Sequence, residues 1–474
     1  MKRKSLGKLW VPTVFLLVTA QKQKKSKTSK EVIRTSYWAH LPSVLLHDIF
    51  DLLSKDDRKN ASAVCKHWRQ NIFHPKWWPS MTFNIEQNNV QKARFYIYTF
   101  GKIVSEAKIK LYSLSVECME EFITLLQLLS ENNNLKSLII EPTHCRFEIP
   151  TRLTENSIDD PWDIMTLLTP NLPKLSKFSI GCIEDLTYFL EDILKNLSPM
   201  KVTHLGLASV KDDPLKYEVS YFDLNLIVPF TKLKVLSIDY DQLCDEFLYK
   251  LEAAKDLERL VVHLHGIRKN HPGTTEKAWV DFHKTHPLCE LRLTIIHAFK
   301  DIENIHETVM RRAMPLSQLK VFFCESLNLE VVQNLSSHYV ETLRSIMWVD
   351  SLSDSDNSCI FVKPSFDQSP DPFLLAAWLC KNLEEFVLYG YKYWEENLVA
   401  ISRLRGKHLR KLEMAENDIY SPYPELGDAL TFISESLQKP WKPTQQNKLH
   451  PVICNPTDGD SDEYLLPIVL ADLH

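Results

Sequence analysis

Glycine is scarce in this sequence, with only 10 glycines among 474 residues. Loops that cradle phosphate groups depend on closely spaced glycines, whose backbone can approach the ligand. The sequence also contains no Walker loop, no G-x-S-x-G and no H-E-x-x-H motif. These absences argue against an enzyme with a nucleotide-binding, serine-hydrolase or zinc-protease site, and we expect no active site.

Paired cysteines are missing as well. The ten cysteines are scattered singly, and no two of them lie within ten residues of each other. The closest histidine pairs, His263-x-His265 and His283-x-x-His286, have no cysteine or carboxylate partners at metal-ligand spacing. We therefore predict no metal and no cofactor. Scattered single thiols behave as small buried hydrophobes in a reducing compartment, which favours the cytoplasm or the nucleus.

An excess of positive charge is also lacking, since 56 basic residues face 61 acidic ones and the net charge is −5. This balance gives no support to a nucleic-acid partner held by bulk positive charge. The composition, 44% hydrophobic and 25% charged, is that of a globular protein. The length predicts two to four domains or one extended array.

Residues 1–36 allow two interpretations. The segment has the layout of a signal peptide: a basic start, the apolar run Val11–Ala20 and small residues at its end. The apolar run is too short to span a membrane. The strongly basic stretch that follows is unusual after a cleavage site. The alternative is a disordered basic leader, or a nuclear address in Lys22, Lys24, Lys25 and Lys27. We expect the leader, and no membrane contact; a secreted protein using residues 1–20 as a signal remains the alternative.

Residues 37–80 predict a compact helical unit. Apolar residues with helical spacing mark one helix with Leu45, Leu46, Ile49, Phe50, Leu52 and Leu53, and a second with Ala61, Val64, Cys65 and Trp68. A unit of about forty residues is near the lower limit for burying a sufficient core. It is therefore either a helical cap on a larger domain or a module that shares its apolar surface with a partner.

The same stretch resembles an F-box, the motif that docks substrate adaptors onto Skp1 in cullin-RING ubiquitin ligases. The resemblance lies in the Leu41-Pro42 opening, the Ile49-Phe50 pair, the Val-Cys-x-x-Trp-Arg run from Val64 and the late Trp78. Val44 departs from the family, which usually has Glu there. The resemblance implies that the Skp1-binding residues are Leu41, Pro42, Leu45, Leu46, Ile49, Phe50, Leu53, Val64, Cys65, Trp68 and Trp78.

A repeat follows, with the pattern apolar-x-x-apolar-x-apolar. Its ten units begin at Leu135, Leu175, Val202, Leu233, Leu257, Leu288, Leu316, Leu343, Leu383 and Leu409. Most intervals are in or just above the range typical of leucine-rich repeats, and helical stretches lie between many units. We predict an α/β fold: a small helical unit followed by a leucine-rich-repeat solenoid over residues 135–438, with residues 81–134 as a transitional region or a cap.

Three segments interrupt or follow the array. The first two are the 40-residue intervals, where we expect insertions, and the second of them carries Ser351, Ser353 and Ser355 beside aspartates. These serines are either phosphorylation sites or part of a solvated loop. The third segment, residues 439–474, is rich in proline and then acidic, and we expect it to be partly disordered.

Alternate side chains of the predicted strands point to the side of the sheet away from the helices, where a target would be held. Both signs of charge and several aromatic residues occur there, a composition that fits a protein ligand. The candidate anchors are Arg259, His263, Arg292, Phe322 and Tyr389, because arginine and aromatic residues dominate binding hot spots.

The stretch from Tyr389 to Trp394, with the segments that follow it, resembles the C-terminal repeats of F-box proteins of the F-box-only protein 33 type. Those combine an F-box with degenerate leucine-rich repeats. The resemblance implies a substrate-recognition subunit of an SCF ubiquitin ligase, which binds Skp1, a cullin-RING core through it, and a protein substrate. A non-catalytic scaffold without ubiquitin transfer is the first alternative, and the secreted repeat protein is the second.

Overall fold

The structure is a computed structural model of the chain, and it describes residues 37–148, 161–351, 371–421 and 427–473. The chain divides into two compact units, residues 1–72 and 73–474. The predictions for residues 1–36, for the centres of both insertions and for Ser353 and Ser355 lie outside the described residues. Among the described residues, no helix combines the length and the apolar character that a bilayer crossing requires.

The first unit is helical, as the spacing of its apolar residues predicts. It contains η1 (Tyr37–His40), α1 (Ser43–Asp51), α2 (Lys55–Ala61) and α3 (Lys66–Ile72). The core side chains Leu46 and Phe50 lie one turn apart on α1, and the Phe50 ring meets the Trp68 ring edge-to-face at 5.6 Å. Ser54 begins α2, since its Oγ accepts the Asp57 N–H and donates to the Asp57 carboxylate.

A parallel sheet organises the second unit. Within its described residues, twelve strands follow one another in chain order, from β1 to β11 and then β13. They are β1 (Ser80–Ile85), β2 (Glu106–Leu111), β3 (Ser137–Pro142), β4 (Lys177–Ser179), β5 (His204–Gly206), β6 (Val235–Asp239), β7 (Arg259–Leu264), β8 (Glu290–Ile296), β9 (Leu316–Phe322), β10 (Ser345–Val349), β11 (Glu385–Tyr389) and β13 (Lys411–Met414). The short strands β12 (Tyr393–Trp394) and β14 (Ile419–Tyr420) pair separately.

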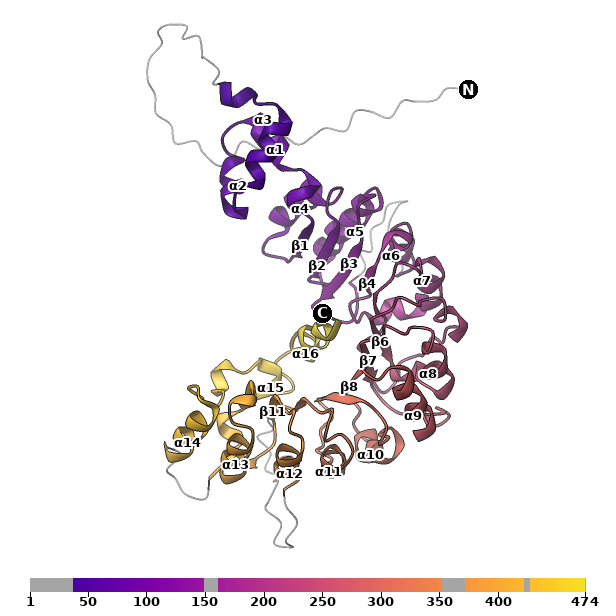
Figure 1. Cartoon of the computed structure of the whole chain (residues 1–474), viewed down its shortest axis with the longest axis vertical. Coiled ribbons are helices and arrows are strands. Elements are labelled where there is room, and N and C mark those ends of the chain that lie inside the picture. Colours follow the sequence, from indigo (N-terminus) through magenta and orange to yellow (C-terminus); the bar gives the residue numbers. More distant parts are fainter. Residues whose placement is uncertain (1–36, 149–160, 352–370, 422–426, 474) are drawn as a thin grey trace. The chain divides into compact units, whose positions relative to one another are not determined.

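Helices α4 to α14 lie along one face of the sheet (Figure 1). They are α4 (Val90–Phe100), α5 (Val116–Ser130), α6 (Pro161–Leu168), α7 (Leu190–Asn196), α8 (Asp245–Leu251), α9 (Glu276–Thr285), α10 (Ile305–Thr308), α11 (Leu329–His338), α12 (Pro372–Leu379), α13 (Glu395–Arg405) and α14 (Gly427–Leu437). A strand followed by a helix, repeated along the chain, confirms the predicted leucine-rich-repeat solenoid.

All ten predicted repeat units coincide with strands, from β3 to β11 and then β13. Their equivalent positions also pair: Leu236 of β6, for example, is opposite Leu260 of β7, which is opposite Leu291 of β8. The structure adds two strands that we did not predict, since β1 and β2 extend the same sheet. Residues 80–130 are therefore the first two strand–helix units of the array.

The C-terminal residues correct a prediction. We expected residues 439–474 to be partly disordered, but residues 439–473 are described throughout and form α15 (Pro451–Cys454), α16 (Ser461–Leu470) and η11 (Ala471–Leu473). We call α16 with η11 the tail helix. It lies on the face of the sheet opposite the helices, here called the inner face (Figure 1). Its buried apolar side chains are Leu465, Leu466, Val469, Leu470 and Leu473. They join a cluster with strand residues such as Val235, Ile296 and Met347, and this burial outweighs the cost of ordering an acidic segment.

Candidate functional site

The first unit exposes more apolar surface than its size would suggest. Val44 is 71% exposed, Leu45 49%, Leu52 88% and Val64 59%. An apolar residue exposed singly needs no explanation, but four aliphatic ones among the 36 described residues of this unit form an unusually apolar surface.

The residues predicted to bind Skp1 fall into two groups. Eight keep some exposed surface, namely Leu41, Pro42, Leu45, Ile49, Leu53, Val64, Cys65 and Trp68. Leu46 and Phe50 have no exposed surface, because they form the core of the helical unit itself. Trp78 is also buried and packs on Phe100 of α4, with ring centroids 4.9 Å apart. These three side chains stabilise the fold, and in this structure they offer no surface to a partner.

Two exposed residues were missed as docking candidates. Leu52 follows α1 and is the most exposed of the four, and Val44 occupies the position where we noted a departure from the F-box pattern. The apolar run through Leu52 was visible in the sequence. Periodicity alone, however, does not show which side of a short helix faces the core when both sides carry leucine.

The five anchors predicted on the sheet occupy the inner face, but the structure covers them. Phe322 has no exposed surface, His263 is 1% exposed and Tyr389 is 4% exposed. Arg259 and Arg292 contact the tail helix directly. The expectation of an accessible face is therefore wrong for these positions in this structure, because residues 441–473 lie over them. Contact with a target stays a prediction.

One acidic residue of the tail helix, Asp472, contacts three cations of the central strands. Asp472 accepts from Arg292 Nη1 at 2.8 Å and from Lys320 Nζ at 2.7 and 2.6 Å, and its backbone carbonyl accepts from Arg259 Nη1 at 2.8 Å. Lys320 is 5% exposed and Asp472 2%. Burial lowers the pKa of Lys320, and burial together with the neighbouring Arg292 lowers that of Arg259. Asp472 partly offsets both effects, so the tail helix helps to compensate the buried charge of these cations.

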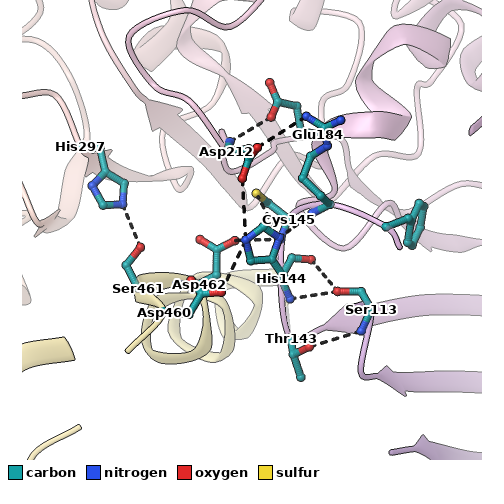
Figure 2. A network of polar contacts seen from close by, with 12 residues as sticks. Ser113, Thr143, His144, Cys145, Glu184, Asp212, His297, Asp460, Ser461 and Asp462 are labelled. Atoms are coloured by element: carbon teal, nitrogen blue, oxygen red, sulfur yellow. Dashed lines mark hydrogen bonds and ion pairs between the residues drawn. The ribbon is translucent and has the colours of Figure 1, made fainter. Parts of the chain in front are cut away.

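The other end of the tail helix is held by the loop after β3 (Figure 2). The Cys145 backbone N–H donates to Asp462 at 2.8 Å, and His144 Nε2 lies 3.5 Å from an Asp460 oxygen and 3.7 Å from an Asp462 oxygen. On the opposite side, His297 Nε2 lies 3.1 Å from Ser461 Oγ. The tail helix is thus anchored at both ends by polar contacts and between them by apolar ones.

His144, Cys145 and Asp462 together resemble a metal site, since their ligand atoms lie within 4.8 Å of one another. Their hydrogen bonds argue against it. His144 Nδ1 accepts the Arg146 backbone N–H at 3.0 Å, so the proton of the neutral ring is on Nε2. Nε2 then donates toward the carboxylates and has no lone pair for an ion. Burial also raises the pKa of the Cys145 thiol far above its usual range, which disfavours the thiolate that a metal requires.

A buried polar network lies beside the anchors on β6 and β7. Asp239 accepts from the Ser209 hydroxyl at 2.6 Å and pairs with Lys211 at 3.1 Å, while His263 and His265 each place a ring nitrogen 3.0 Å from the Ser209 carbonyl. Burial lowers the pKa of His265 to about 3, so its ring is neutral. Each group is used in bonding the strand-end loops, which indicates a structural role for His263 and His265.

Part of the inner face stays open. A hollow of about 330 Å³ lies over the first strands, where Lys108, Lys177 and His204 meet the end of the tail helix at Leu473. Residues of β1 and β2 that point the same way, such as Thr82 and Lys110, are exposed. This part of the face is polar and lacks the apolar floor found beneath the tail helix.

Comparison with known proteins agrees with the two-part organisation. Residues 38–84 match the model of the F-box-like family. The chain is 22% identical to F-box only protein 33 of Homo sapiens over 85% of this chain and 82% of that protein. It is also 22% identical to F-box only protein 33 of Mus musculus, over 82% of this chain and 78% of that protein.

Among solved structures, the crystal structure of the Rad7 and Elc1 complex in yeast contains a chain that aligns with 80% of this one. The alignment covers 89% of that chain, with 13% sequence identity and a TM-score of 0.39.

Proposed function

We propose that this chain, which carries an F-box-like domain and resembles F-box only protein 33, is the substrate-recognition subunit of an SCF-type ubiquitin ligase. The observation that carries the proposal is the first unit: it matches the F-box-like model and exposes Leu45, Leu52 and Val64. A small helical unit with exposed apolar side chains gains stability when a partner covers them. That partner would be Skp1.

The array would then hold the target protein. Catalysis in this arrangement is proximity, since a cullin-bound RING subunit brings a ubiquitin-loaded enzyme close to lysines of the held target. The chain itself does no covalent chemistry in this proposal. Its F-box-like domain and its similarity to an F-box protein support an adaptor role, and the cytoplasm and the nucleus are the compartments that we propose for it.

Skp1 affinity tests the proposal directly. Replacing both Leu45 and Val64 by aspartate puts charge on exposed positions without touching the core pair Leu46 and Phe50. We expect this variant to bind purified Skp1 about a hundredfold more weakly, because two apolar anchors are lost and two charges are buried. Leu288→Asp is the matched control, since Leu288 is 86% exposed on the array. Equal Skp1 affinity for the double variant and the control would refute docking through this surface.

A further inference from the structure

Three cations from adjacent strands meet on the inner face. Arg259 lies on β7, Arg292 on β8 and Lys320 on β9, and the contacts described above bring all three to the residue Asp472. Buried cations contribute little net stability, and apolar side chains of similar volume would hold a permanent cover at least as well. Three of them that converge on one residue give this position the character of a recognition site for an acidic group.

The tail helix presents the matching chemistry. Its buried positions are two apolar pairs, Leu465-Leu466 and Val469-Leu470, with the acid Asp462 before them and Asp472-Leu473 after them. Glu463, Pro467 and Ala471 face solvent. Spacing of this kind is how an amphipathic helix binds a groove on another protein. The helix therefore supplies a pattern that a segment of a different protein could also supply.

The end of the tail helix approaches the sheet closely at Gly206. A Cβ at Gly206 of β5 would lie 2.7 Å from Leu473 Cδ1 and 2.8 Å from Ser179 Oγ, so glycine lets the Leu473 side chain lie directly on the strand.

The tail helix is joined to the array like a tethered ligand. The residues that precede it, 456–459, are exposed, and Pro467 removes one backbone hydrogen bond within the helix. The contacts that hold the helix on the sheet are the polar ones at its two ends and those of the apolar pairs between them. A tethered occupant of this kind competes with a ligand in solution at an effective concentration on the order of 1 mM.

We propose that the inner face over β5–β9 is a binding site for a helical segment of a target protein, with paired apolar residues and an acidic residue in the place of Asp472. The tail helix is the chain's own occupant of this site, and the target's segment replaces it. The inference rests on the proposed function in one respect: it is that function which makes the ligand a target for ubiquitin transfer. Binding at the site itself is independent of Skp1.

Peptide exchange on the full chain tests the site. A specific protease sequence inserted between Thr457 and Asp458, which are exposed, allows the tail helix to be cut from the array after folding. A fluorescent peptide of residues 460–474 is then added, and its anisotropy is followed. We expect the labelled peptide to replace the cut segment. A second peptide that keeps all buried and half-buried positions, with only the exposed Glu463, Pro467 and Ala471 changed, should bind within about tenfold of the first.

Charge provides the matched comparison. The Asp472→Asn peptide should bind about a hundredfold more weakly, because the cations remain buried without their partner, whereas the Glu463→Gln peptide, changed at an exposed position, should bind unchanged. A chain carrying Lys320→Glu should prefer a peptide with Asp472→Lys over the natural one.

Each contrary outcome is informative. If the cut segment never exchanges, if cutting unfolds the array, or if the Asp472→Asn peptide binds as well as the natural one, the tail helix is permanent core and the inference is overturned. Skp1 affinity is measured on the same cut chain. Failure of peptide exchange with intact Skp1 binding contradicts this inference alone, and peptide exchange with no Skp1 binding contradicts the proposed function alone.

Discussion

At the scale of single residues, buried charge decides how the inner face behaves. Asp472 partners Lys320 and Arg292 in a place where water is almost excluded. Removing one member of a buried ion pair costs more than the pair contributes in net terms, since the other charge is left without a partner. The strand pattern correctly placed Arg259 and Arg292 on the inner face, but it predicted that they are exposed. That error arose because Asp472, which they contact, lies far along the chain.

Asp472→Asn should therefore loosen the tail helix. We expect a loss of about 3 kcal/mol in the free energy that holds it against the sheet. Hydrogen exchange measured by mass spectrometry should show faster exchange in α16 while β7 to β9 remain protected. Glu463→Gln serves as the control, since its side chain is exposed. Unchanged protection of α16 in Asp472→Asn would show that the ion pairs contribute little.

Asp350 makes the stability of the array depend on pH. Burial raises its pKa to about 7, even though the Tyr391 hydroxyl and the Glu325 N–H donate to the carboxylate. Because this value exceeds that of an unfolded aspartate, the Asp350 carboxyl binds more protons in the folded state between about pH 4 and 7, and its contribution to the unfolding free energy falls as the pH rises from 4 through 7. Asp418 has a pKa raised to about 7 by burial as well.

Urea unfolding of the array at pH 6.5 and 8 tests this assignment. Each of these two carboxyls should contribute about 0.8 kcal/mol of extra stability at the lower pH. Asp350→Asn should lose its share, so the stability of the variant at pH 6.5 relative to pH 8 should be about 0.8 kcal/mol lower than that of the original chain. The assignment of a raised pKa to Asp350 is wrong if the variant and the original chain show the same difference.

At the scale of elements, the first helical unit separates residues that fold from residues that dock. Phe50 packs on Trp68 inside the unit, while Leu45 on the same helix is 49% exposed. Both would reduce Skp1 binding when changed, but for different reasons. The sequence pattern treats them alike because both are apolar and belong to the same helical face, and we predicted both to bind Skp1.

Phe50→Ala should cost about 3–5 kcal/mol, more than so small a unit can lose. We expect fast hydrogen exchange throughout α1 to α3 together with loss of Skp1 binding. Leu45→Asp should weaken Skp1 binding with exchange in α1 to α3 unchanged. If Phe50→Ala left exchange in these helices as slow as before, the core assignment of Phe50 would be wrong.

Strands were predictable where leucine marked them. The ten units at β3 to β11 and β13 begin with leucine in nine cases and with Val202 in one, whereas those at β1 and β2 read Trp78-x-x-Met81-x-Phe83 and Val104-x-x-Ala107-x-Ile109. Both fit the apolar pattern, and a search that gave no weight to leucine would have found them. The fold depends on burial at these positions, which Ala107 and Val104 provide as well as leucine does.

The tail helix was not predictable from its composition. Its acidic residues and prolines indicate disorder, and only the apolar run from Tyr464 to Leu470 indicates a buried element. The cations that pair with Asp472 lie between 152 and 213 residues earlier in the chain. A single sequence does not show such long-range pairing, because the local pattern is compatible with a disordered segment as well as with a buried helix.

At the scale of the whole molecule, the chain combines a module with an exposed apolar surface and an array with a site already occupied by its own tail helix. The proposed division of labour is that the first unit binds Skp1 and the array binds the target. The tail helix adds a condition, since a target that uses the central strands must replace it, while a target that uses only β1 and β2 need not.

Assembly with a cullin core is the measurement that tests the central claim most directly. The purified full chain is mixed with Skp1 and a cullin bound to its RING partner, and the mass of the complex is determined by light scattering during size-exclusion chromatography. We predict one complex that contains all four proteins, from which the chain with Leu45→Asp and Val64→Asp is absent and in which the Leu288→Asp chain is retained. Failure to bind Skp1, or a complex with Skp1 that never includes the cullin, would contradict the account.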